Sequence, residues 1–195
     1  MWFHVRQSGR EPVFQSDQKV YGMLAGLALV AGCSGNGDSP GEVSGNVARA
    51  MLAGADGKEY GEVIVAQGDG ELLVNISAAG LSPGAYGVHI HETGECDGPD
   101  FKSAGGHWNP TQKQHGFDNP QGAHMGDLFN LDIGTDGSGS LEAIIAGGTL
   151  KGDDNALLDD DGASLIVHAG PDDLQSDPSG DSGDRLACGV FIGGR

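Results

Sequence analysis

Apolar and polar residues alternate along most of the chain beyond residue 46. In residues 71–77, Leu72, Val74 and Ile76 alternate with neighbours that include Glu, Asn and Ser. Strands that bury one face have this period of two. The pattern predicts about eight strands, at 46–52, around 63–66, and at 71–77, 86–92, 128–134, 140–146, 164–168 and 187–192.

Segments rich in glycine and aspartate separate these strands. The chain of 195 residues contains 36 glycines, and four of the segments have the composition of tight turns: 54–57, 68–70, 82–84 and 136–139. No segment carries a long apolar stripe at helical spacing. The sequence therefore predicts an all-β fold, an antiparallel sandwich or barrel.

Two long stretches, 93–126 and 169–185, interrupt the predicted strands. Loops of this length are uncommon unless they are functional or disordered. The first stretch contains three of the seven histidines, and two more stand just before it in the strand 87–92. We therefore expect the first loop to be functional.

Within the strand 87–92, the period of two directs His89 and His91 to the same face. Such a pair could simply lie at the surface. However, His107, His115 and His124 follow in a loop rich in Gly, Pro and Asn, and Asp127 stands three positions after the last. Three imidazoles and one carboxylate suit tetrahedral Zn²⁺. Closing a polar loop on a metal would supply the energy that orders it.

The N-terminal segment has the composition of an export signal. Three basic residues precede an apolar run at 20–31, which is too short to span a membrane. Residues 30–33, Val-Ala-Gly-Cys, resemble a bacterial lipobox, in which Cys33 would be lipidated. The alternative is an ordinary signal peptide with an incidental cysteine. We expect an export signal at 1–33, a flexible linker at 34–45 and one domain at 46–195.

The net charge of −18 and the absence of a Lys and Arg cluster argue against a nucleic-acid partner. We expect an exported protein, in the periplasm or at the cell surface, which contacts a membrane only through its N-terminal lipid. Sequence does not choose between a monomer and a homodimer.

Several motifs together resemble the bacterial copper/zinc superoxide dismutases. They are Gly-Val-His-Ile-His-Glu at 87–92, Gly-Gly-His-Trp-Asn-Pro at 105–110, His-Met-Gly-Asp-Leu at 124–128, Val-His at 167–168 and Gly-Asp-Arg-Leu-Ala-Cys-Gly at 183–189. The resemblance implies an eight-stranded antiparallel Greek-key barrel. It implies copper ligands at His89, His91, His107 and His168, and zinc ligands at His107, His115, His124 and Asp127. His107 would bridge the two metals.

The resemblance also assigns roles outside the ligands. Asp172 would accept hydrogen bonds from His89 and His115, although it could be one more solvated aspartate. Arg185 would hold the anionic substrate beside copper, although an isolated loop arginine is most often solvated. Cys96 and Cys188 would form a disulfide rather than two free thiols, as export permits. Cys33 is then the odd cysteine, as a lipid attachment site would be.

The implied activity is dismutation of superoxide to dioxygen and hydrogen peroxide, with Arg185 and His107 as the catalytic residues and copper and zinc as cofactors. One alternative is a non-enzymatic copper/zinc-binding domain that buffers or delivers metal on the same fold. Another is a structural surface lipoprotein that metals merely stabilise.

Overall fold

The computed structural model describes residues 46–152 and 154–193. The predicted export signal and linker lie outside the described residues. None of the helices in the described part of the chain is long and apolar enough to cross a membrane. The elements are β1 (Val47–Gly54), β2 (Glu59–Gln67), β3 (Glu71–Ala79), β4 (Gly84–Tyr86), β5 (Val88–His91), the 3₁₀ helix η1 (Lys102–Ala104), β6 (Leu131–Ile133), β7 (Ser138–Ala146), β8 (Ser164–His168), β9 (Arg185–Val190) and β10 (Ile192–Gly193).

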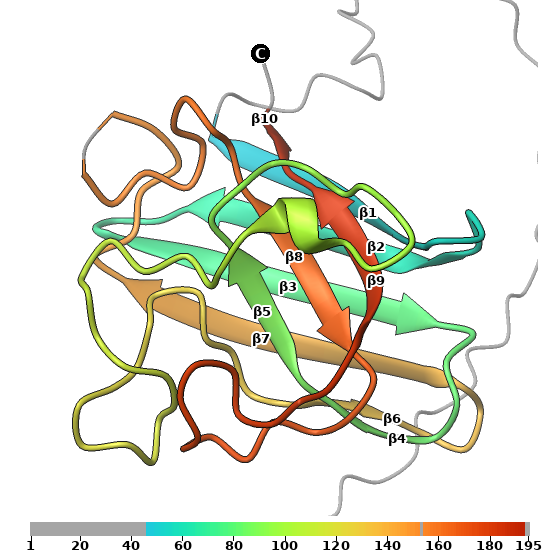
Figure 1. Ribbon diagram of the computed structural model, residues 1–195. Coiled ribbons are helices and arrows are strands. Elements are labelled where there is room, and N and C mark those ends of the chain that lie inside the picture. The colour runs from blue at the N-terminus through green and yellow to red at the C-terminus, as the bar shows by residue number, and fades with distance from the viewer. Residues whose placement is uncertain (1–45, 153, 194–195) are drawn as a thin grey trace, which may run out of the picture. The chain divides into compact units, whose positions relative to one another are not determined.

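The strands form a closed antiparallel barrel. One path of paired strands runs β5-β8-β9-β1-β2-β3-β7, and β4 pairs separately with β6. The two parts join because β4 continues into β5 across Gly87, and because the hydrogen bond from Gly134 N–H to Ser138 O connects β6 to β7 (2.8 Å). Figure 1 shows β5, β8 and β9 crossing in front of β1, β2, β3 and β7.

The predicted fold class, an eight-stranded Greek-key barrel, is confirmed. Counting β4 with β5 and β9 with β10 as single interrupted strands reduces the ten segments to eight. Strands distant in sequence are neighbours in the sheet, as β5 and β8 are, which produces the Greek-key connection.

The barrel interior is filled by the inward-facing residues that the alternation predicts. In β3, Leu72, Val74 and Ile76 are buried, whereas Leu73 and Asn75 are exposed. Burying one such side chain completely stabilises a fold by about 1.5–3 kcal/mol. The alternation therefore determines which face of each strand points into the barrel and which face points out of it.

Two predicted strands are shorter than expected. The strand 86–92 breaks at Gly87, where a Cβ would lie 2.9 Å from the Cβ of Ser182 in the loop between β8 and β9. The predicted strand 128–134 is reduced to β6, because the Asn130 side chain forms hydrogen bonds with the main chain of Asp172. In both places the contact with the second long loop replaces regular strand structure.

The histidine face of β5 lies outside the barrel core but is buried. Val88 and Ile90 pack in the core, so His89 and His91 point to the other face, where both are almost fully covered. The covering segments are the long loops 92–130 and 169–184. A disulfide between Cys96 and Cys188, 92 residues apart in sequence, fastens the first loop to β9.

Candidate metal centre

Four histidines from three parts of the chain form the first cluster. They are His89 and His91 of β5, His107 of the first long loop and His168 of β8, and their ligand atoms lie within 4.8 Å of one another. The antiparallel pairing of β5 with β8 brings the first and last of these together. The isolated bridge between His91 and His107 places the loop histidine opposite the strand.

Each histidine of this cluster has one ring nitrogen in contact with a protein oxygen. His91 Nδ1 donates to Gly105 O (3.1 Å), and His168 Nδ1 donates to Gly183 O (3.1 Å). His89 Nε2 lies 2.7 Å from Asp172 Oδ2, and His107 Nδ1 lies 2.8 Å from Asp127 Oδ1. These contacts set the orientation of all four rings and leave the other nitrogen of each ring available.

The remaining four nitrogens are buried without a hydrogen-bond partner among the described residues. They are His89 Nδ1, His91 Nε2, His107 Nε2 and His168 Nε2. Buried polar atoms are almost always satisfied, so four unsatisfied nitrogens in one cluster require an explanation. Converging imidazole nitrogens are ligands for copper or zinc, and a bound cation would satisfy all four.

A second cluster shares His107 with the first. Its members are His107, His115, His124 and Asp127, again with ligand atoms within 4.8 Å. Three Nδ1 atoms converge on Asp127 Oδ1, at 2.8 Å for His107, 3.0 Å for His115 and 3.2 Å for His124. The contact of His115 lacks hydrogen-bond geometry. Three nitrogens and one oxygen arranged in this way fit a tetrahedral zinc ion.

The main chain orients the carboxylate of Asp127. Its Oδ2 accepts hydrogen bonds from the N–H groups of Gly116 and His124, both at 3.0 Å. These bonds leave Oδ1 directed at the three imidazoles. Burial alone would raise the pKa of Asp127, but its close contacts with the three histidine rings hold that pKa far below its usual value. Asp127 therefore remains an anionic ligand.

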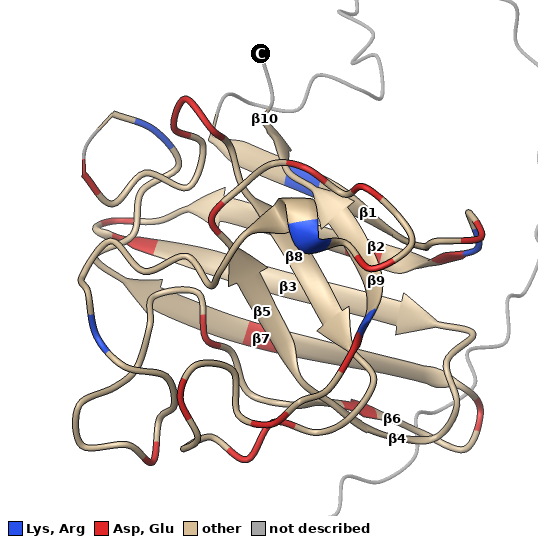
Figure 2. Ribbon diagram, in the orientation of Figure 1, with Lys and Arg blue, Asp and Glu red and all other residues tan. Residues whose placement is uncertain are grey.

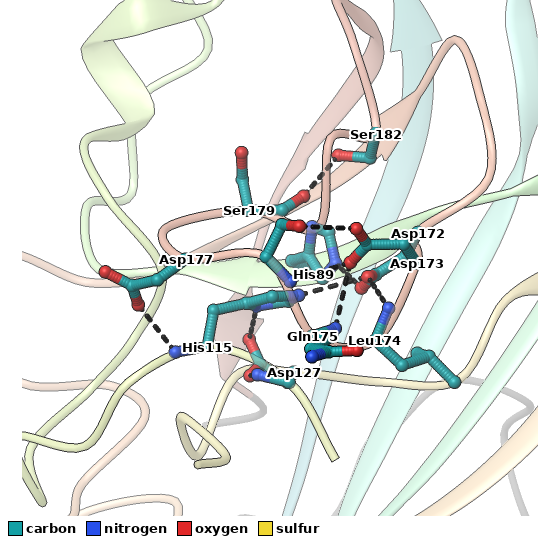
Figure 3. A network of polar contacts seen from close by, with 12 residues as sticks. His89, His115, Asp127, Asp172, Asp173, Leu174, Gln175, Asp177, Ser179 and Ser182 are labelled. Atoms are coloured by element: carbon teal, nitrogen blue, oxygen red, sulfur yellow. Dashed lines mark hydrogen bonds and ion pairs between the residues drawn. The ribbon is translucent and has the colours of Figure 1, made fainter. Parts of the chain in front are cut away.

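Asp172 connects the two clusters. Its Oδ2 contacts His89 Nε2 (2.7 Å), and its Oδ1 contacts His115 Nε2 (3.0 Å). Figure 3 shows both rings directed at this carboxylate. Asn130 in turn accepts from Asp172 N–H (2.8 Å) and donates to Asp172 O (2.9 Å). One residue of the second long loop thus sets the orientation of one histidine in each cluster.

Burial keeps the first cluster neutral. It lowers the pKa of His89 to about 3, of His91 to about 2 and of His168 to about 4. The pKa of His107 is also lowered, mainly by burial. Burial lowers the pKa of His115 too, but its contacts with Asp127 and Asp172 outweigh burial and raise that pKa to about 9. Neutral imidazole is the form that binds metal.

Arg185, at the start of β9, adjoins the first cluster. It is the register partner of His168, and its charge contributes to the lowered pKa of His91. Its guanidinium donates to Phe101 O (2.6 Å) and Gly105 O (2.7 Å). The preceding loop, 169–184, carries five aspartates and no Lys or Arg (Figure 2). That loop therefore adds negative rather than positive charge next to Arg185 in sequence.

Comparison with known proteins agrees with this geometry. The family model for copper/zinc superoxide dismutase (SODC) matches residues 59–191, which is more than half of the chain. The chain belongs to the copper/zinc superoxide dismutase family. The cofactors of a member with these histidine and aspartate groups are copper and zinc.

Two bacterial relatives and one bacterial crystal structure are similar to this chain. Copper/zinc superoxide dismutase 2 of Aquifex aeolicus (strain VF5) is 39% identical over 176 residues, 89% of this chain and 99% of its own. Superoxide dismutase-like protein YojM of Bacillus subtilis (strain 168) is 44% identical over 146 residues, 73% of this chain and 74% of its own. The crystal structure of a superoxide dismutase-like protein from Bacillus subtilis has a TM-score of 0.70 at 42% identity and covers 74% of this chain and 97% of its own.

The structure brings together the residues that the sequence singled out within the described range. The seven predicted ligand residues fall into two clusters of four that share His107, and Asp172 and Arg185 lie beside them. The predicted disulfide joins the first long loop to β9. Cys33 lies outside the described residues. Sequence reasoning missed Asn130 and the carbonyl of Gly105. No local signal marks either, because their partners, Asp172 and Arg185, are more than 40 positions away.

Proposed function

We propose that this protein is an active superoxide dismutase, which converts two superoxide anions and two protons to dioxygen and hydrogen peroxide. In this proposal, copper binds at the first cluster and zinc at the second, and His107 bridges them. The observation that carries the proposal is the set of four unsatisfied buried nitrogens beside a main-chain-anchored arginine.

Bound copper supplies a one-electron couple, which both halves of a dismutation need. The residues of the chain provide the remaining functions. Arg185 offers a fixed, permanently charged guanidinium to a small dioxygen anion. His107 presents Nε2 to the first cluster, and we assign to this atom the proton that is passed to the departing peroxide.

The second cluster would fix the bridging ring. Zinc held by this cluster would fix the ring of His107, whose Nδ1 lies 2.8 Å from Asp127 Oδ1, and would thereby keep Nε2 directed at the first cluster. In this role zinc performs no redox chemistry. It orders a loop that is too polar to order itself by burying apolar groups.

The test is superoxide consumption by protein loaded with one copper and one zinc. We expect fast consumption, and a loss of about ten- to a hundred-fold in Arg185→Ala, which corresponds to about 1.4 kcal/mol per tenfold. Metal content should remain unchanged, because Arg185 is not a ligand in this proposal. Arg49→Ala is the matched control, since Arg49 is half-exposed and its ion pair among the described residues is with Glu62 at the surface.

Absence of consumption above that of protein carrying zinc alone would overturn the proposal. A protein that binds both metals without turnover would then be a metal buffer or delivery domain. The name of the Bacillus subtilis relative, a superoxide dismutase-like protein, makes this comparison necessary.

We also propose export to an oxidising compartment with a lipid on Cys33. The predicted export signal and lipobox support it, and a Cys96–Cys188 disulfide is stable outside the cytoplasm. Incorporation of labelled fatty acid that disappears in Cys33→Ser would support the lipid, whereas unlabelled secreted protein would indicate an ordinary signal peptide.

A further inference from the structure

Each histidine of the second cluster directs Nδ1 at Asp127, and the Nε2 atoms of the three rings have different environments. His107 directs Nε2 into the first cluster, and His115 directs Nε2 to Asp172 Oδ1 at 3.0 Å. His124 is the third, and its Nε2 lies 3.9 Å from Asp177 Oδ1. A metal-bound histidine usually donates its other ring N–H to a carboxylate, a carbonyl or water. Asp177 is therefore placed to serve His124 as Asp172 serves His115.

Asp177 also holds the main chain of the same loop. Its Oδ1 accepts a hydrogen bond from the N–H of His115 at 2.7 Å. One carboxylate oxygen thus lies between the backbone of one zinc-cluster histidine and the ring of another. Figure 3 shows Asp177 and Asp172 on either side of His115.

The two loops are packed closely at this point, which limits how far Asp177 can move from His124. The N–H of Asp118 donates to Leu174 O at 2.8 Å. Gly116 adjoins the same carbonyl, and a Cβ there would lie 2.2 Å from Leu174 O. The gap of 3.9 Å between Asp177 and His124 can be closed by a small side-chain rotation or bridged by one water.

We propose that Asp177 is a positioning residue of the zinc site, which orients the ring of His124 while it anchors the backbone of His115. The loop 169–184 then supplies one carboxylate to each of the two zinc histidines that do not bridge, Asp172 for His115 and Asp177 for His124. The proposal rests on the assignment of zinc to the second cluster and does not depend on dismutation.

Two substitutions separate positioning from a purely structural role. Asp177→Asn keeps an oxygen that can accept from His115 N–H but removes the charge that the N–H of His124 would face. Asp177→Ala removes both. Asp173→Asn is the matched control, because within the described part of the chain the Asp173 carboxylate accepts from residues of its own loop, Gln175 and Ser176.

The experiment measures zinc transfer from copper- and zinc-loaded protein to a colorimetric chelator at neutral pH. Losing the partner of a metal-bound histidine typically weakens metal affinity by about 10- to 100-fold. We expect Asp177→Asn and Asp177→Ala to release zinc about tenfold faster or more, and Asp173→Asn to match the wild type. With Co²⁺ in place of zinc, the visible spectrum should shift in both Asp177 variants.

Thermal unfolding of the metal-free variants provides the second readout. A structural role predicts that Asp177→Asn behaves as the wild type in every assay and that only Asp177→Ala is destabilised. Wild-type zinc release and an unchanged Co²⁺ spectrum in Asp177→Asn would therefore overturn the proposal, as would wild-type protein that retains no zinc. Protein that retains zinc through Asp177 but consumes no superoxide would refute the enzymatic function and leave this inference standing.

Discussion

Arg185 and His91 donate hydrogen bonds to the same backbone carbonyl. Gly105 O accepts from Arg185 Nη2 at 2.7 Å and from His91 Nδ1 at 3.1 Å. One atom of the first long loop, Gly105 O, thus orients both the His91 ring and the Arg185 guanidinium. The position of the proposed anion-binding group is therefore coupled to that of a proposed copper ligand.

We expect Arg185→Lys to behave as a partial loss. A lysine keeps the charge, but its ammonium is a point charge and cannot replace the forked contact with Phe101 O and Gly105 O. The value of kcat/KM should fall about tenfold, and the electron paramagnetic resonance spectrum of bound Cu²⁺ should change because Gly105 O loses a donor. Arg49→Lys should alter neither, and unchanged kinetics in Arg185→Lys would contradict the coupling.

Asn130 is expected to control the position of Asp172. Asn130→Ala removes two hydrogen bonds to the main chain of Asp172. We expect a loss of about 1–3 kcal/mol in the free energy of unfolding of the metal-free protein, since buried backbone groups lose their partners. Affinity for both metals should also fall, as competition with a chelator would measure. Asn75→Ala, which removes an exposed contact with Glu142, should have little effect.

The disulfide should contribute strongly to stability. Reduction of Cys96–Cys188 opens a link between residues 92 apart, for which loop-closure entropy gives about 4–5 kcal/mol. We expect the denaturant midpoint to fall on reduction and to the same extent in a Cys96→Ser, Cys188→Ser double variant. Reductant should not affect the double variant. Equal midpoints with and without reductant in the wild type would contradict the prediction.

The metal-free protein should lose stability as the pH falls from 6.5 toward 4. The folded-state pKa is about 3 for His89, about 2 for His91 and about 4 for His168, each lowered mainly by burial from 6.5. Between pH 6.5 and 4 the unfolded chain therefore binds more protons than the folded protein, so lowering the pH favours unfolding. Denaturant midpoints measured across this range would test it, and a flat profile would contradict it.

His115 contributes with the opposite sign. Its contacts with Asp127 and Asp172 outweigh burial and raise its folded-state pKa to about 9, so the folded protein binds the proton more tightly than the unfolded chain. That contribution is fully present below pH 6.5 and is lost as the pH rises through 9. The metal-free wild type should therefore lose stability between pH 6.5 and 9, and His115→Gln should remove this loss.

Much of the fold could be predicted from the sequence because its signals are local. The alternation in residues 71–77 assigns Leu72, Val74 and Ile76 to the core, since side chains of a strand point to opposite faces. The same rule places His89 and His91 together. The breaks at Gly87 and before Leu131 could not be predicted, because they result from contacts with the loop 169–184.

The sequence by itself determined the strand pattern, the kinds of ligand and, through spaced motifs, the family. Only the tertiary structure decided which nitrogen of each ring is free, that Gly105 O joins Arg185 to His91, and that Asp177 faces His124. The physical reason is that these relations depend on hydrogen bonds between residues far apart in the chain. Side-chain periodicity fixes the face on which a residue lies, but closure of the barrel and docking of the two loops fix its partner.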